Sequence, residues 1–186
     1  MKTVAEQLGQ TPHLSPLLRK LRAIGLVAPE DLLHLAVVRG CSHYQQLGDQ
    51  VRPFDSRTTQ ISNLELALAM VAAAQSFDPM LVRCAAQLLS GDDISVEAIA
   101  RLAMQERAVQ VVRHIAKAGL EMDLIDQDKW RRLLGILPAA PEVPEGRLPH
   151  RTRFISQTGI TRHNGLLERT PRTIWLRPEP HTQVQR

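Results

Sequence analysis

One stretch of the chain is apolar almost throughout, and the sequence on either side of it is more mixed. Residues 62–77 read SNLELALAMVAAAQSF and contain one charged residue, Glu65. A helix that is apolar on all sides belongs inside a packed protein. Ser62 and Glu65 have the spacing of a capping box, and Asp78 with Pro79 ends this segment and begins another. We therefore expect a buried central helix over residues 62–77.

Apolar residues recur at helical spacing on both sides of this stretch. They predict helices over residues 15–24, 29–39, 79–89, 95–103, 108–118 and 127–136. Most of these segments follow a local start signal, which is Ser15 with Pro16, Pro29, Asp78 with Pro79, or Ser95. Gly25, Gly40 and Gly119 are expected to end three of the helices. Residues 41–60 are expected to form a loop.

This series of segments predicts an all-α fold, an irregular helical bundle of about five to seven helices made of antiparallel helix pairs. The aromatic content of 3% agrees, because strands are enriched in aromatic side chains. Ile61-Ser62 and Ile94-Ser95 stand 33 residues apart, as in a helical repeat. The two halves share little else, so we favour a plain bundle over a repeat.

The composition changes after Pro138. Residues 138–149 contain four prolines, and proline is incompatible with a helix interior. We divide the chain into a helical domain (1–138), a proline-rich linker (139–149) and an extended basic arm (150–186). Since the predicted core lies wholly before Pro138, a chain truncated there is expected to fold.

The positive charge of the chain is concentrated in this last part. Residues 1–138 hold 15 Lys and Arg and 15 Asp and Glu, whereas residues 139–186 hold eight Arg and four Glu. Two segments of the arm, 153–157 and 172–177, have strand-like composition. Arginine pairs with phosphate and carboxylate groups. The candidate contacts to a partner or a phosphate are therefore Arg151, Arg153, Arg162, Arg169, Arg172, Trp175 and Arg177.

Three interpretations of the arm stay open. In the first, Trp175 and Ile174 dock on the helical body and leave the arginines solvated. In the second, the arm binds a protein partner or a neighbouring subunit. In the third it binds nucleic acid, with Phe154 and Trp175 stacked on bases.

A second candidate for nucleic-acid binding lies at the start of the chain. Residues 3–27 have a small residue, Ala5, four positions before Gly9, then a basic second helix and a closing GLV. In these features the segment resembles the recognition half of a winged-helix regulator. The resemblance implies base or phosphate contacts from Arg19, Lys20 and Arg22. The chain after this segment is expected to be helix rather than a β-wing.

Residues 95–119 also have the helix, break, helix rhythm of a DNA reader, with Gln110, Arg113 and Lys117 on the outward side of the second helix. The zero net charge of residues 1–138 argues against both segments, because phosphate contacts need a basic face.

The sequence shows no motif for catalysis or cofactor binding. Cys41 and His43, with His34 before them, are the nearest approach to a set of metal ligands, but a structural zinc site needs four. Cys84 falls on an apolar helix face and is expected to be a small core residue. We therefore expect no catalytic, cofactor or metal residues.

The longest apolar run has nine residues, 66–74, which is too short to span a bilayer. The start of the chain lacks the apolar segment of a signal peptide. A cytoplasmic protein without membrane contact is therefore expected.

These observations favour a non-catalytic helical interaction protein, an adaptor or scaffold, whose basic arm contacts a protein partner or a second copy. The alternative is a nucleic-acid-binding regulator that uses the segment at residues 3–27. An enzyme is the third interpretation.

Overall fold

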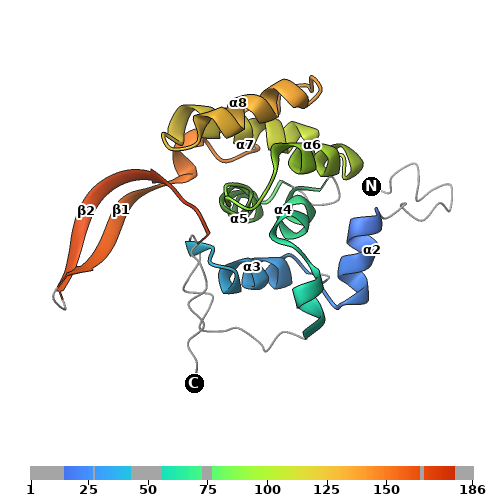
Figure 1. Cartoon of the computed structure of the whole chain (residues 1–186), viewed down its shortest axis with the longest axis horizontal. Coiled ribbons are helices and arrows are strands. Elements are labelled where there is room, and N and C mark those ends of the chain that lie inside the picture. The colour runs from blue at the N-terminus through green and yellow to red at the C-terminus, as the bar shows by residue number, and fades with distance from the viewer. Residues whose placement is uncertain (1–14, 27, 43–55, 73–76, 164–165, 179–186) are drawn as a thin grey trace.

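The computed structural model describes residues 15–26, 28–42, 56–72, 77–163 and 166–178. In this part of the chain a body of seven α-helices is followed by a two-stranded hairpin (Figure 1). The helices are α2 (Pro16–Ala23), α3 (Pro29–Val38), α4 (Asn63–Val71), α5 (Pro79–Leu89), α6 (Val96–Gln105), α7 (Val109–Met122) and α8 (Gln127–Ile136). Two 3₁₀ turns, η2 (Ser56–Gln60) and η3 (Arg151–Arg153), precede α4 and the hairpin respectively. The predicted all-α bundle is confirmed.

The helix α4 lies at the centre of the body, as its apolar sequence predicts. All of its residues from Leu66 to Val71 are buried. It packs against α5 and also contacts α2, α3 and α6. In Figure 1, α4 and α5 lie between α6, α7 and α8 on one side and α2 and α3 on the other. The other helices are thus arranged around this pair.

The ends of α4 show what local signals can specify. Ser62 accepts from the backbone N–H of Glu65 at 3.1 Å, and Glu65 accepts from the Ser62 N–H at 2.9 Å, so the capping box is confirmed. The helix is shorter than expected, however, because it ends at Val71 and Ala72 is extended (ψ 151°). Alanine has the highest helix propensity, so the sequence contains no sign of this end.

The serine and aspartate start signals are confirmed elsewhere. Ser15 accepts from the Leu18 N–H at 3.2 Å, and Ser95 accepts from the Ala98 N–H at 3.2 Å. Asp78 accepts from the Met80 N–H at 2.7 Å. Each bond satisfies a backbone donor that has no partner within its helix.

The expectation that Gly119 ends its helix is wrong. α7 continues through Gly119 to Met122. A Cβ atom at Gly119 would lie 2.6 Å from ring atoms of Trp130 on α8. The glycine is therefore needed for close packing of α8 on α7, and not for a turn. By contrast Gly25 follows α2 with a φ of +85°, which favours glycine.

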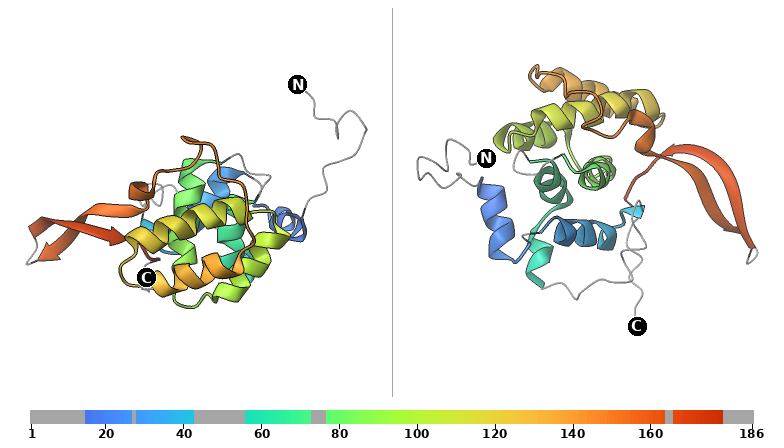
Figure 2. Two further views of the ribbon diagram at one scale, coloured as in Figure 1. Left: turned by 90° about the horizontal axis from the view of Figure 1, so that it is seen from above. Right: turned by 180° about the vertical axis from the view of Figure 1, so that it is seen from behind.

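The arm is a β-hairpin, longer than the two short strands that its composition indicates. β1 (Ile155–His163) pairs antiparallel with β2 (Leu166–Trp175), with a register shift between Ser156 and Thr158. The intervening sequence contains Gly159 and Pro171, which are uncommon in strand interiors, so composition alone did not reveal the pairing. The hairpin projects away from the helical body in each of the views (Figures 1 and 2).

The hydrophobic core does not end at Pro138. Leu148, Phe154, Ile155 and Trp175 are all buried and belong to the same core cluster as the helices. The expectation that the core lies wholly before Pro138 is therefore wrong, because the start of β1 and the end of β2 fill space between the helices. The division into three domains remains a prediction.

Candidate functional site at the base of the hairpin

Aromatic side chains gather where the hairpin joins the body. Trp175, at the end of β2, lies with its ring centroid 5.5 Å from Phe154 and 5.5 Å from Trp130. The planes of Trp175 and Phe154 are 24° apart, which is a stacked arrangement. These are three of the six aromatic residues of the chain. The hairpin is therefore attached through the largest and stiffest side chains that the sequence offers.

A buried ion pair adjoins this cluster. Asp123, which is 1% exposed, follows α7. Its two carboxylate oxygens accept hydrogen bonds at 3.1 Å from the guanidinium of Arg177. The indole Nε1–H of Trp130 donates to the same carboxylate at 2.9 Å. Asp123 thus connects α8 to the chain that leaves β2.

Backbone contacts hold the same chain on its other side. The amide Nε2 of Gln87 on α5 donates to the Arg177 carbonyl at 2.7 Å. The single hydroxyl proton of Ser90 is shared between the Gln87 carbonyl at 2.6 Å and the Leu176 carbonyl at 3.1 Å. The residues just after β2 are therefore fixed by α5 as well as by Asp123.

Lys129 on α8 is buried near this site. Its ammonium donates to the Gly91 carbonyl at 2.7 Å. Burial is the largest effect on its pKa and lowers it below the ordinary lysine value, and the nearby Arg177 also lowers it. Asp126, Asp92 and Asp93 act in the opposite direction.

Among the arginines predicted to contact a partner, the structure separates Arg177, which is paired in the interior, from Arg151 and Arg153, which are exposed. Arg177 is bound to Asp123, and the Trp175 side chain is 4% exposed, so neither lies on an open surface. Arg151 is exposed and paired with Glu121 of α7. Arg153 is exposed and, with Arg83, lines an open groove of about 490 Å³ at the base of β1. Docking of Trp175 on the body is therefore confirmed, whereas Ile174 is 39% exposed.

The three remaining arginines lie in the hairpin strands. The register pairs Ile160 with Arg169 and Arg162 with Leu167. Residues that are opposite one another, or two apart on one strand, share a face of a sheet. Arg162 and Arg169 therefore occupy positions on the same face, while Arg172 falls beside the register shift.

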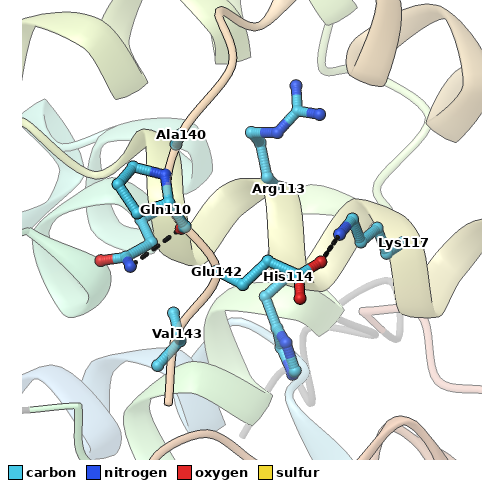
Figure 3. A pocket seen from close by; sticks show the side chains of 8 residues that line it. Gln110, Arg113, His114, Lys117, Ala140, Glu142 and Val143 are labelled. Carbon is cyan, nitrogen blue, oxygen red and sulfur yellow. Dashed lines mark hydrogen bonds and ion pairs between the residues drawn. The ribbon is translucent and has the colours of Figure 1, made fainter.

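The outer side of α7 is covered by the proline-rich segment (Figure 3). Gln110 donates to the Pro141 carbonyl at 3.0 Å, and Lys117 pairs with Glu142 at 2.7 Å. The guanidinium of Arg113 donates to the Leu137 carbonyl at 2.9 Å. These were the three outward residues of the second DNA-reader candidate. Each already has a partner within the chain, which counts against this candidate.

A cavity of about 200 Å³ remains between α7 and this segment. His114 on its wall lies 2.9 Å from the Pro149 carbonyl through Nε2. The Lys117 ammonium lowers the pKa of the exposed Glu142 below its ordinary value. Gln110, Arg113, His114 and Lys117 on the wall thus each have a partner within the chain.

One of the three basic residues of α2 forms an ion pair within the body. Arg19 and Arg22 are exposed, but the Lys20 ammonium lies 2.7 Å from Oε1 of Glu65 on α4. Partial burial raises the pKa of Glu65, but hydrogen bonds from Lys20 and Ser62 outweigh this effect and leave it below the ordinary value. Residues 3–14 of the helix-turn-helix-like segment lie outside the described residues.

Potential metal ligands do not converge within the described part of the chain, where no three His, Cys, Asp or Glu residues form a site. Cys41 is buried, and its thiol donates to the Cys84 carbonyl at 3.7 Å. A hydrogen bond with the Cys84 side chain, followed by burial, strongly raises the pKa of the Cys41 thiol. His43 lies outside the described residues.

Sequence reasoning missed Asp123 and Glu121, which pair with Arg177 and Arg151 at the base of the hairpin, and Arg83, which lines the groove beside Arg153. Asp123 and Arg177 are 54 positions apart, and neither stands in a motif. The low aromatic content was the one indication of this site in the sequence. A chain with six aromatic residues is expected to bury them at its most closely packed positions.

No protein-family model, curated protein or solved structure matches this chain. Among the described helices, none combines the length and the apolar character needed to cross a membrane.

Proposed function

We propose that this chain is a non-catalytic binding protein whose helical body holds a basic β-hairpin out to an acidic partner. The observation that carries the proposal is the attachment of a projecting hairpin through Trp175, Phe154 and the Asp123–Arg177 pair. An element fixed at its base keeps its direction, which reduces the entropy lost on binding.

The charge of the hairpin supports an acidic partner. The hairpin, residues 155–175, contains three arginines, Arg162, Arg169 and Arg172, and a single acidic residue, Glu168. Arginine presents several donors in a fixed plane and pairs well with carboxylates. The helical domain as predicted has no net charge, so the hairpin is the part of the molecule that would attract an acidic surface.

The hairpin itself also favours a partner. A two-stranded hairpin alone is marginally stable in water. In the described structure β1 and β2 form a sheet of two strands, so each has one edge that pairs with no other strand. Contact with a partner along the hairpin would stabilise it.

Nucleic acid is the second candidate partner, because a two-stranded β-ribbon fits the major groove of DNA. In this version the ribbon, and not α2, makes the phosphate contacts. Binding to random duplex or single-stranded oligonucleotides would then weaken steeply as salt increases.

The proposal is tested by site-specific photo-crosslinking in the host cell. A photoreactive amino acid replaces Thr161 in the hairpin or, as a matched control, Arg19 on α2. We expect discrete adducts from position 161. They should disappear when Arg162→Glu and Arg169→Glu are combined, and persist when Arg19→Glu and Arg22→Glu are combined.

Nuclease and protease treatment of the adducts distinguishes nucleic acid from protein. Adducts that form at position 19 alone and disappear with Arg22→Glu would instead support the α2 regulator. An absence of specific adducts at position 161 would contradict a role for the hairpin.

A further inference from the structure

Glu106 is a buried carboxylate whose environment does not satisfy it. The residue is 5% exposed, and no donor among the described residues reaches its Oε2 atom. Buried carboxylates in proteins are normally paired or hydrogen-bonded. The position is unfavourable for a second reason, because Glu106 is the C-cap of α6, where the helix dipole disfavours negative charge.

The backbone around Glu106 fixes this position. The Ala108 N–H donates to the Ala103 carbonyl at 2.8 Å, and Arg107 adopts a φ of +56°. This is the geometry of a helix end closed by a left-handed residue. Glycine normally occupies such a position, so the left-handed conformation of Arg107 carries a local conformational cost.

Glu106 lines an open cavity of about 470 Å³ where α2, α4 and α6 meet. Leu17 and Leu102 form apolar parts of the wall, and the Lys20–Glu65 ion pair forms another part. Figure 1 shows these three helices next to one another on the side of the body away from the hairpin. The cavity is therefore separate from the base of the hairpin.

The charges of the wall indicate what the cavity would accept. Lys20 is 2.7 Å from Glu65, so these two charges compensate each other. The carboxylate of Glu106 remains without a counter-charge among the described lining groups. A cationic nitrogen would supply the missing donor and charge, and an aliphatic stem would fit against Leu17 and Leu102.

We propose that this cavity binds a primary alkylammonium group, with Glu106 as its counter-charge. The group can come from a free alkylamine or from a lysine side chain of a peptide. The two sources share the same chemistry and differ in what surrounds the stem. This site does not depend on the function proposed for the hairpin.

The test is a titration followed by methyl NMR of Leu17 and Leu102. The probes are n-butylammonium chloride and Nα-acetyl-lysine-N-methylamide, with 1-butanol as the uncharged control and sodium chloride to match ionic strength. We expect saturable shifts of both leucines with at least one cationic probe and no saturable shift with 1-butanol. Saturation by both cations would indicate that the amine suffices, and saturation by the lysine analogue alone would indicate a peptide source.

Glu106→Gln keeps the shape of the side chain and removes its charge, so binding should weaken about tenfold or more. Glu97→Gln is the matched control, since Glu97 is on the same helix, exposed and paired with Arg132. A second variant, Leu102→Phe, narrows the cavity without changing its charge and should also weaken binding. No saturable shift with either cation, or equal binding by Glu106→Gln and the wild type, would overturn the proposal.

Discussion

Two carboxylates that are buried in the described part of the chain have opposite surroundings. Asp123 at the base of the hairpin accepts from Arg177, from Trp130 and from the Ile125 N–H at 3.3 Å. Glu106 on the other side of the body has an oxygen with no donor among the described residues. A satisfied buried carboxylate holds elements together, whereas an unsatisfied one costs stability. The difference separates a structural site from a candidate ligand site.

The largest loss of stability is expected from deleting the part of the chain that Asp123 and its neighbours contact. A chain truncated after Pro138 loses Phe154, Ile155, Trp175 and Arg177 and leaves Trp130 exposed. Replacing one buried aromatic residue by alanine costs about 3–5 kcal/mol, so losing two of them should abolish cooperative unfolding. Thermal unfolding followed by circular dichroism measures this. A truncated chain with a cooperative transition would show that the helical body is independent of the hairpin.

The substitution Asp123→Asn tests the ion pair by itself. It removes the counter-charge of Arg177, which is 24% exposed at its side chain. Breaking a buried pair from one side costs about 3 kcal/mol or more, and urea unfolding should detect this loss. Asp128→Asn is the control, because Asp128 is exposed and pairs with Arg131 on the same helix; its effect should be within about 0.5 kcal/mol. Equal effects of the two substitutions would contradict the role given to Asp123.

Gly119→Ala tests the packing that places Trp130 next to Asp123. The added methyl group would overlap the buried indole, so we expect a loss of about 1–3 kcal/mol. Gly135→Ala is the matched control in α8, where an added Cβ would meet none of the described atoms within 4 Å. This change should stabilise the protein by up to about 1 kcal/mol, since alanine is the better helix former. Chemical unfolding of both variants gives the comparison, and a stabilising Gly119→Ala would rule out the close contact.

Glu106→Gln should change stability in the opposite direction to Asp123→Asn. Removing a charge that lacks a partner and opposes the helix dipole is expected to raise the free energy of unfolding by about 0.5–1 kcal/mol. Urea unfolding at neutral pH, without any added amine, measures the change. A marked loss of stability would mean that Glu106 has a structural partner after all, and the comparison with Asp123 would fail.

The smallest effect concerns Glu65, a carboxylate between these two extremes. Its pKa is lowered in the folded protein, so its contribution is present above the unfolded-state pKa of about 4.3. It is lost as the pH falls through the lower, folded-state pKa. The side chain of its partner Lys20 is 40% exposed, so the contribution is at most about 1 kcal/mol. Unfolding free energies from pH 6 to pH 3 should therefore fall less for Glu65→Gln than for the wild type, and parallel pH profiles would argue against it.

The sequence predicted the start of a helix correctly where the interaction that begins the helix is between neighbouring residues. Ser15, Ser62, Asp78 and Ser95 begin helices through bonds to their own next turn, and each of them can be recognised from neighbouring residues alone. Gly119 looked like a helix end because its real reason, the ring of Trp130, is tertiary.

The candidate sites were hidden for the same reason. The Asp123–Arg177 pair depends on a contact between positions 54 apart, and no local pattern reports it. The hairpin is different, because the dipeptide Asn164-Gly165 between its strands is a local hairpin signal that the sequence analysis did not use. Glu106 precedes a break between two helices, where a charged residue is unremarkable in sequence. Its burial and its lack of a donor become visible only when α2, α4 and α6 are brought together.

The contacts of Arg177 also bear on how the chain is made. Its carbonyl accepts from Gln87, a residue 90 positions earlier, so this part of the body closes only after a ribosome has delivered the end of β2. Until then Trp130 and the space for Trp175 remain accessible to solvent, chaperones and proteases. Contacts between such distant positions slow folding. A nascent chain that stops before Trp175 would therefore expose this aromatic surface, the kind of surface that chaperones bind and that promotes aggregation.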